Sequence, residues 1–378
     1  MPGDLAADIA DAEKAVHDLN TSEAEHASLE GMARVLLRTE AVASSRIEGL
    51  VAGPRRLLRA EALLSQEEPY SDRTAVEIIG NIRAMETAIA FGTSRQDFTL
   101  QHLLEMHRQI MENSYRPDLG GLIRTSQNWI GGSNYNPLRA AYIPPPPELV
   151  SELVCDLIEY LNGDYHSPLV QAGIAHAQFE TIHPFADGNG RTGRALIHLA
   201  LRRRGLAPRF VPPVSLMLAT WTNDYIEGLT TYRHTSPPDS PARSKGAHTW
   251  LRTFAFATRQ ACLQACLFAS EVAALHNRWR ERMGPTRRDS SASLLLTVLP
   301  GAPLVSVKTA AALIGRSTVN TNAAINRLVE AGVLAQHNIG KQRYRIFEAP
   351  EIIDLITKRE QAITSSIPDG RNGDSGRA

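Results

Sequence analysis

Residues 169–205 read LVQAGIAHAQFETIHPFADGNGRTGRALIHLALRRRG, and this stretch decides the fold of the chain. Its first half is apolar at almost every position, which is typical of a helix buried on most of its faces. Ser167 and Pro168 suit the cap and the first turn of that helix, and Pro184 ends it. A second apolar helix is expected over 191–204, before a glycine. We therefore expect two central helices joined by a glycine-rich polar loop.

The segments on either side predict a mainly α protein with one hairpin and a small C-terminal domain. Residues 124–147 differ from the helical remainder, because extended runs surround a turn rich in Gly, Ser and Asn and four prolines follow, which predicts a β-hairpin. After residue 285, a helix, a glycine turn and a second helix capped by Ser317 precede two short strands, which is the pattern of a winged helix-turn-helix domain. Further helical patterning covers residues 5–47, 73–92, 99–113, 147–162, 222–233 and 246–282.

These changes in sequence pattern predict the domain boundaries. We expect an N-terminal helical region over 1–95, a central domain over 96–283 and the winged helix over 285–350. The tail, 364–378, carries too few apolar side chains to fold by itself.

Composition favours a soluble globular protein without a polyanionic partner for the molecule as a whole. Of its 378 residues 43% are hydrophobic, and Lys+Arg and Asp+Glu each total 40. The three cysteines show no metal-ligand spacing. The N-terminus lacks a basic start followed by an apolar run, and no stretch approaches the roughly 18 apolar residues of a membrane helix. The sequence therefore predicts a cytoplasmic protein that does not contact a membrane.

The polar loop between the central helices has the chemistry of a polyphosphate site. Gly188, Asn189 and Gly190 precede a helix, so their N–H groups can converge on an anion that the helix dipole also favours. Arg191 and Arg194 lie three residues apart in the first helical turn and therefore point to one side. Two guanidinium groups beside such N–H groups suit phosphate oxygens.

The same loop offers a metal ligand and a base. Asp187 would repel phosphate unless a hard cation lay between them, and Mg²⁺ is commonly held by one carboxylate plus phosphate oxygens. His183 is a base whose ordinary pKa lies near neutrality. The chain has no GxxxxGK[ST] motif, so this is not a Walker-type nucleotide site.

Residues 183–194, HPFADGNGRTGR, resemble the signature of Fic-domain proteins, HPFx(D/E)GNGRxxR, at every fixed position. The N-terminal helices, the hairpin and the C-terminal domain are also similar to those of Fic proteins that carry a winged helix. The resemblance implies a helical Fic core and transfer of AMP from ATP to a Ser, Thr or Tyr hydroxyl of a protein. It also implies that the hairpin is a flap that aligns an extended stretch of the target by strand pairing.

The resemblance assigns roles to the loop residues. His183 would take the proton from the attacking hydroxyl, and Asp187 would coordinate Mg²⁺ between the α- and β-phosphates of ATP. Residues 188–190 would form the anion hole with the support of Arg191. Arg194 would reach the γ-phosphate.

Residues 44–49, SSRIEG, are similar to the inhibitory motif (S/T)xxxE(G/N) of the same family. Their position implies the class with an N-terminal inhibitory helix, expected here around 33–49. Glu48 would pair with Arg194 in the place of the γ-phosphate. Ser44 lies four residues earlier, on the same helix face, and can steady the carboxylate.

The C-terminal domain carries a local excess of basic residues, which suits contact with a phosphate backbone. We therefore consider DNA a partner, although winged helices also serve as dimer and protein-docking modules. The residues expected to reach base edges are Thr318, Asn320, Thr321 and Asn322, with Arg343 or Arg345 from the wing.

Two other functions stay open at this point. Glu48 could orient a water that removes AMP from a modified protein, which is the reverse chemistry. The chain could also be a DNA-binding regulator in which the Fic loop only senses nucleotide. A homodimer is a further expectation. His176 in the first central helix has no metal-ligand spacing around it, and a buried core histidine is the better interpretation.

Overall fold

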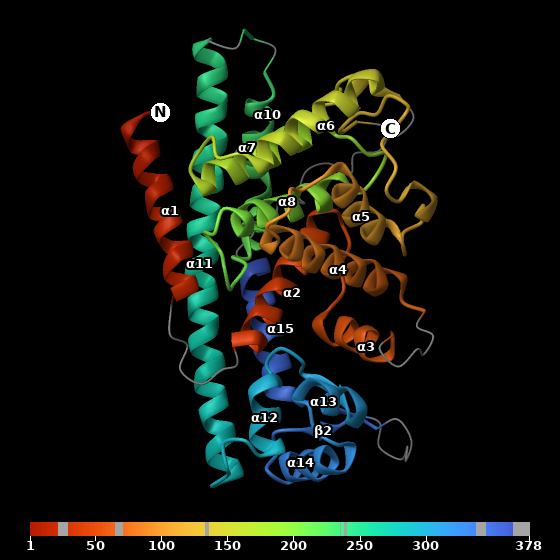
Figure 1. Ribbon diagram of the computed structural model, residues 1–378, viewed down its shortest axis with the longest axis vertical. Coiled ribbons are helices and arrows are strands. Elements are labelled where there is room, and N and C mark those ends of the chain that lie inside the picture. The colour runs from red at the N-terminus through yellow and green to blue at the C-terminus, as the bar shows by residue number, and fades with distance from the viewer. Residues whose placement is uncertain are drawn as a thin grey trace, which may run out of the picture.

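The computed structural model describes residues 1–21, 29–64, 71–132, 136–234, 236–237, 240–337 and 345–365. Within these ranges the protein is mainly helical with a small sheet, as the sequence predicts (Figure 1). The first part of the chain forms α1 (Gly3–Thr21), α2 (Leu29–Ile47), α3 (Pro54–Leu64), α4 (Arg73–Thr93), α5 (Leu100–Met111), α6 (Pro147–Asn162), α7 (Pro168–Ile182), α8 (Asn189–Arg203), α9 (Val214–Thr220), α10 (Thr222–Tyr232) and α11 (Pro241–Met283). Two short 3-10 helices are η1 (Pro117–Leu119) and η2 (Pro137–Arg139).

A C-terminal module follows α11. It comprises α12 (Ser291–Val298), β1 (Leu304–Ser306), α13 (Val307–Ile314), α14 (Thr318–Glu330), β2 (Ala335–Gln336), β3 (Ile346–Glu348) and α15 (Pro350–Ser365).

The long helix α11 connects the two parts of the molecule. It runs alongside α1 and α10 for much of its length, and its end contacts α12 and α15 of the C-terminal module (Figure 1). Its buried face carries large side chains, among them Trp250, Phe254 and Trp279. Burying such aromatic side chains is a main source of packing energy, so α11 fixes the module against the helical body.

The two central helices are α7 and α8, and they pack against each other. α8 also packs on α4, while α7 contacts α6 and α11. Both are buried on most faces, so polar side chains such as Gln171 and His198 are also enclosed. The prediction that Ser167 caps α7 through its side chain is wrong, since no such bond forms. Pro168 does occupy the first turn, where its missing N–H costs nothing.

The N-terminal region is divided more finely than its patterning indicated. The single helical span expected over 5–47 is α1 and α2, and residues 22–28 lie outside the described ranges. α2 ends at Ile47, and Gly49 follows with a φ of 81°, which favours glycine. The helix α3 was not predicted, because its stretch carries an uneven apolar pattern with several arginines.

The predicted hairpin at 124–147 forms with less strand than expected. A single antiparallel bridge joins Ile130 to Tyr142, and a second bridge joins Ile123 to Phe185 of the polar loop. Prolines cannot donate to a ladder, and those at 144–147 therefore shorten the second strand. Residues 133–135 lie outside the described ranges.

In the C-terminal module, α13 and α14 are joined by a turn at Gly315 with a φ of 62°, and Ser317 caps α14 by accepting from the N–H of Asn320. The antiparallel sheet has the order β1-β3-β2, with Val305 and Gln336 on either side of Phe347. The strand β1 and the helices α12 and α15 were not predicted.

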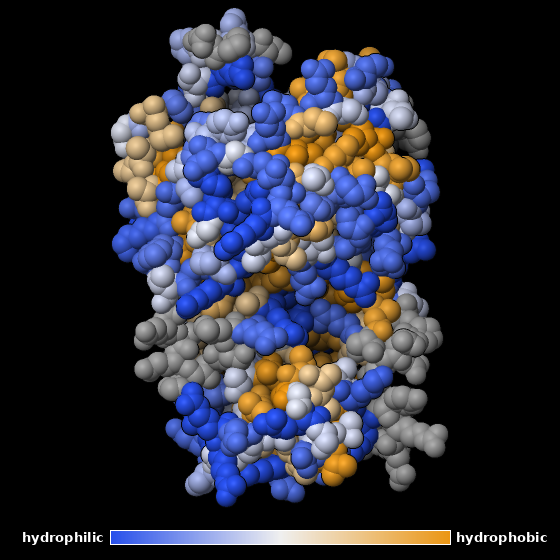
Figure 2. Space-filling model, viewed as in Figure 1, coloured by the Kyte–Doolittle hydropathy of each residue, from blue (hydrophilic) through white to orange (hydrophobic). Residues whose placement is uncertain are grey.

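Figure 2 shows the surface hollowed between the C-terminal module and the helices above it, with hydrophilic side chains in the hollow. The expected tail from about 364 begins within α15, and residues 366–378 lie outside the described ranges. Among the described helices none combines the length and the apolarity that a membrane crossing requires.

Candidate active site

The loop after α7 is fixed by its own side chains. His183 adopts left-handed backbone angles, φ 49° and ψ 59°, which are uncommon for a residue with a side chain. The Asn189 side chain bonds the N–H of Phe185 at 2.9 Å and its carbonyl at 2.8 Å. The Phe185 ring is buried and stacks on His107 of α5, with ring centroids 3.7 Å apart. His183, the loop and α8 are therefore held together as one unit.

The loop ends at the N-terminus of α8, where helical N–H groups lack intrahelical partners. Gly188 has a φ of 75°, and its N–H donates to Oδ1 of Asp187 at 2.6 Å. A methyl group at Gly190 would overlap Oε1 of Glu48, so the Glu48 carboxylate lies directly at this helix end. A carboxylate at a helix N-terminus occupies the position that favours an anion.

Arg194 is buried beneath that carboxylate. Its Nη2 lies 2.7 Å from Oε1 of Glu48, and the Arg194 side chain is 1% exposed. Ser44 also holds the guanidinium, since its hydroxyl accepts from Nε at 2.9 Å and its carbonyl accepts from Nη2 at 2.8 Å. Ser44 therefore steadies Arg194 and not, as the sequence predicted, the Glu48 carboxylate.

Electrostatics match this geometry. Burial tends to raise the pKa of Glu48, but attraction to Arg194, with smaller contributions from Arg191 and His183, lowers it below its usual range. Burial tends to lower the pKa of Arg194, and Glu48, followed by Tyr225, raises it above its usual range instead. Both groups are therefore charged at neutral pH, and the pair is an ion pair.

The charge of Glu48 also acts on the imidazole of His183, where it favours the protonated form. Burial chiefly, followed by the cation of Arg233, lowers the pKa of His183 to about 4. Its Nδ1 lies 3.8 Å from Oε2 of Glu180, a buried carboxyl whose pKa burial raises to about 7. His183 is therefore neutral at pH 7, the state in which it can accept a proton.

Arg191 and Asp187 complete the loop. Arg191 is buried, and within the described part of the chain its Nε and Nη1 have no hydrogen-bond partner. Asp187 is exposed, and no group of three metal-ligating side chains occurs among the described residues. One exposed carboxylate suits a Mg²⁺ whose other ligands are phosphate oxygens and water, but it does not form a metal cage by itself. The residues thus fit a cation that arrives with a nucleotide.

The structure therefore brings together all the site residues that the sequence predicts: Ser44, Glu48, His183, Asp187, Gly188, Asn189, Gly190, Arg191 and Arg194. His176 is a buried core residue, as expected, and its Nε2 lies 2.9 Å from the hydroxyl of Tyr225.

Sequence reasoning missed two arginines at the site. Arg233, just after α10, lies over the ring of Tyr142 at 4.6 Å and donates to the carbonyl of Glu180 at 3.3 Å. Arg124 is 4% exposed and donates to the carbonyl of His183 at 2.9 Å. For Arg124 the sequence offered one signal, a basic residue at the start of the predicted hairpin. For Arg233 it offered none, because the contact of Arg233 with Tyr142 of the hairpin depends on the tertiary fold.

The C-terminal residues expected at base edges are not equally accessible. Thr321 is fully buried and donates to the carbonyl of Ser317 at 2.8 Å, so its predicted role is wrong. Asn322 accepts from Nη2 of Arg345 at 2.6 Å, which engages both side chains. Thr318 and Asn320 are exposed, and Arg343 lies outside the described ranges.

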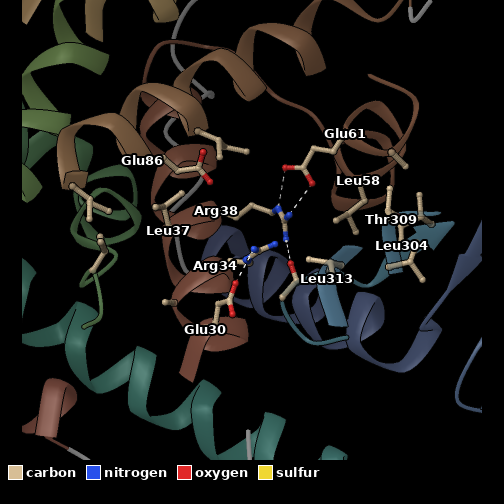
Figure 3. Close-up of a pocket in the computed structure, with 18 of the residues that line it drawn as sticks. Glu30, Arg34, Leu37, Arg38, Leu58, Glu61, Glu86, Leu304, Thr309 and Leu313 are labelled. Atoms are coloured by element: carbon tan, nitrogen blue, oxygen red, sulfur yellow. Dashed lines mark hydrogen bonds and ion pairs between the residues drawn. The ribbon is translucent and has the colours of Figure 1, made fainter. Parts of the chain in front are cut away.

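A cavity of about 640 Å³ lies away from this site, between α2, α3, α4 and the C-terminal module (Figure 3). No residue of 183–194 lines it. Its polar groups are partly paired with one another, since Arg38 contacts Glu61 and Arg34 contacts Glu30. The cavity borders α2, the helix that precedes Glu48, and is separate from the loop over 183–194.

Comparison with known proteins supports a family assignment. Residues 97–201 match the profile of the Fic/DOC family, and residues 6–90 match that of the Fic/DOC family N-terminal region. The protein adenylyltransferase fic-1 of Caenorhabditis briggsae is 33% identical over 145 residues, which are 36% of this chain and 26% of that protein. The protein adenylyltransferase Fic of Drosophila melanogaster is 34% identical over 139 residues, again 36% of this chain and 26% of that protein. The similarity thus spans about a quarter of the length of these relatives.

Solved structures agree on the fold. A Fic family protein from Desulfovibrio desulfuricans aligns with a TM-score of 0.56 at 20% identity, covering 92% of this chain and 96% of that one. Residues 134–508 of Fic-1 from Caenorhabditis elegans align with a TM-score of 0.51 at 24% identity, covering 70% of this chain and 74% of that one. These likenesses show the fold, and the two family matches, over residues 6–90 and 97–201, show that the chain is a Fic-domain protein.

Proposed function

We propose that this protein transfers AMP from ATP to a hydroxyl group of a protein side chain, and that Glu48 holds it inactive. The observation that carries the proposal is the ion pair of Glu48 with Arg194 at the N-terminus of α8, beside the neutral His183. A carboxylate there occupies an anion site that also suits a terminal phosphate. The names of the relatives, protein adenylyltransferases, support the same activity.

The reaction is a substitution at the α-phosphorus. His183 accepts the proton of the attacking hydroxyl through its imidazole, a new P–O bond forms between that oxygen and the α-phosphorus, and the bond to the leaving pyrophosphate breaks. The low pKa of His183 keeps the base unprotonated before attack. Such catalysis depends mainly on positioning and charge neutralisation.

The loop residues supply these two effects. The N–H groups of residues 188–190 and the guanidinium of Arg191 face the phosphates, and the free Nε and Nη1 of Arg191 are available donors. Arg194 holds the γ-phosphate once Glu48 has moved. Mg²⁺, when bound through Asp187, supplies further neutralisation of the phosphate charge.

Glu48 inhibits by occupying the place of the γ-phosphate. As long as its carboxylate contacts Arg194, the negative charge of Glu48 repels a triphosphate, and the guanidinium of Arg194 is not available to bind the γ-phosphate. The inhibited state is therefore built into the chain, and release of α2 near Glu48 starts the reaction.

The test is incorporation of label from ATP labelled at the α-phosphate into protein, with the γ-labelled nucleotide in a parallel sample. Label from the α-phosphate alone supports AMP transfer, and His183→Ala removes it. Label from the γ-phosphate would mean phosphoryl transfer and would contradict the proposal.

The reverse reaction, release of AMP from a modified protein, would use the same groups. Substitution of Glu48 distinguishes release from transfer. If Glu48 orients a water to release AMP from a modified protein, Glu48→Gly abolishes release, whereas transfer rises. The contact with Arg194 favours the inhibitory role, because it places the carboxylate on the cation and not on a water site.

The remaining expectations stay predictions: a cytoplasmic location, a homodimer, and DNA as a partner of the C-terminal module in the manner of a winged helix. The basic residues of the module support DNA binding. The burial of Thr321 and the pairing of Arg345 with Asn322 leave fewer side chains for base contact. Altered migration of a labelled duplex by the whole chain at low salt tests it.

A further inference from the structure

One buried arginine connects the flap to the catalytic histidine. The guanidinium of Arg124 donates to two carbonyls at the end of α7, those of Ile182 at 3.4 Å and His183 at 2.9 Å. It also donates to carbonyls on both arms of the flap, those of Ser126 at 3.2 Å and Pro145 at 2.5 Å.

These contacts are directional and buried. A planar guanidinium offers five N–H donors in a fixed fork, so its four partners are held in fixed relative positions. No carboxylate lies within ion-pair distance of Arg124 among the described residues, and the cation is held by main-chain carbonyls at a helix C-terminus, where positive charge is favourable. The arrangement therefore orders the backbone and does not merely neutralise a charge.

Both connected segments need external support. Among its described residues the flap has a single internal bridge, Ile130 to Tyr142, so this pairing does not fix its position. His183 has left-handed backbone angles, which are unfavourable for a residue with a side chain. Asn128 adds weaker support, since its amide donates to the carbonyls of Phe185 at 3.0 Å and His183 at 3.4 Å.

We propose that Arg124 is a positioning residue that sets the distance between a target hydroxyl aligned on the flap and the imidazole of His183. This inference rests on the proposed function, because the target strand is aligned only in that reaction. The phosphate site itself lies on residues 187–194, which Arg124 does not contact. Loss of Arg124 should therefore slow transfer without weakening nucleotide binding.

The experiment compares Arg124→Ala and Arg124→Lys in a Glu48→Gly background, with Arg139→Ala as the matched control. Arg139 is an exposed arginine of the same flap. The measurements are the rate of AMP incorporation into protein at saturating ATP, the affinity for a fluorescent ATP analogue, and thermal unfolding.

We expect Arg124→Ala to lower the maximal rate by about tenfold or more, as misplacement by an ångström can do, with analogue affinity within about twofold of the parent. Lysine should restore only part of the rate, because one ammonium group cannot bond four spread carbonyls. A rate within about twofold of the parent for Arg124→Ala would overturn the inference, as would a parallel loss of affinity. If the alanine variant folds poorly, Arg124→Lys carries the same comparison.

A second readout separates this inference from the proposed function. Amide hydrogen exchange should accelerate together in Arg124→Ala at Tyr142 in the flap and at His183 after α7, but not in Arg139→Ala. If the parent protein transfers no AMP, the proposed function fails. Amide hydrogen exchange alone then decides whether Arg124 couples the flap to His183. Acceleration in one segment without the other would show that Arg124 does not couple them.

Discussion

Oε1 of Glu48 lies 2.7 Å from Nη2 of Arg194, although the two residues are 146 positions apart in the chain. The contact joins the turn that follows α2 to the second turn of α8, so the position of this N-terminal segment decides what lies against Arg194. Glu48 is 38% exposed on its side chain, whereas Arg194 is 1% exposed. The carboxylate can therefore leave, while the guanidinium stays in place.

Replacing Glu48 should activate the protein. Glu48→Gly removes the carboxylate that competes with the γ-phosphate, and we expect AMP incorporation to rise by at least about tenfold, which corresponds to roughly 1.4 kcal/mol. The measurement is label transferred from ATP to protein at equal protein concentration. Glu30→Gly is the matched control, because Glu30 lies in α2 and pairs with Arg34 of that helix. Equal labelling by the wild type and Glu48→Gly would refute inhibition.

The pH dependence of transfer should follow His183 and Arg233. Because the pKa of His183 is lowered to about 4, we expect kcat/KM to stay level well below pH 6.5 and to fall only as the imidazole takes up a proton. Arg233→Gln removes a cation that disfavours the imidazolium form of His183, so the decrease of kcat/KM at low pH, the acid limb of the profile, should begin at a higher pH. Arg252→Gln, a surface arginine paired with Asp4, should leave the limb unchanged. A limb near pH 6.5 in the parent would contradict the assignment of His183 as a neutral buried base.

The loop over residues 183–194 was the most predictable part of this molecule. His183, Asp187 and Arg194 lie within one turn–helix unit, so local backbone chemistry is enough to bring them together. The two central helices were predictable for a similar reason, since their apolar pattern has no exposed face. Predictions failed where the outcome depended on distant segments, as for Ser44, whose hydroxyl bonds Arg194 of α8.

Long-range contacts explain the other differences. Arg124 bonds carbonyls from 2 to 59 positions away, and no local pattern indicates such a set of partners. The flap contains too little regular pairing for its strand pattern to fix its length, since Asn128 and Arg124 bond its carbonyls and those of the loop instead. The contact of Glu48 with Arg194 was reached through family resemblance and not through spacing.

Acid should destabilise the fold through its buried histidines. Burial lowers the pKa of His107 to about 4, of His176 to about 3 and of His183 to about 4, so each takes up a proton on unfolding below pH 6.5. Glu180 acts in the opposite sense, because burial raises its pKa to about 7 and the folded state holds its proton. Burial also raises the pKa of Glu77 and Glu86, which act in the same sense as Glu180. Because the three histidines each gain a proton on unfolding, we expect the free energy of unfolding to decrease as the pH falls from about 6 to 5.

Urea unfolding at a series of pH values measures this slope. Glu180→Gln should steepen it, since a group that opposes the histidines is removed. Stability that is constant or rises on going from pH 6 to 5 would contradict the burial of neutral histidines.

The contact between α2 and the C-terminal module should affect both stability and activity. A side chain at Gly301 would meet the backbone of Gly31 in α2, with its Cβ 2.7 Å from that carbonyl oxygen. Nearby, Arg38 of α2 donates to the carbonyl of Gly301 at 3.3 Å and to Glu61 at 2.7 Å (Figure 3). Gly301→Val should therefore separate the module from α2, at a cost of about 1–3 kcal/mol in the free energy of unfolding, as overpacking does.

Because Glu48 follows directly after α2, the same substitution should raise basal AMP incorporation. The measurements are thermal unfolding and labelling from ATP. Arg38→Ala should act in the same direction and more weakly, whereas Arg34→Ala is the control, since Arg34 pairs with Glu30 of its own helix. A destabilised Gly301→Val protein with unchanged labelling would show that the module braces α2 without influencing the contact of Glu48 with Arg194.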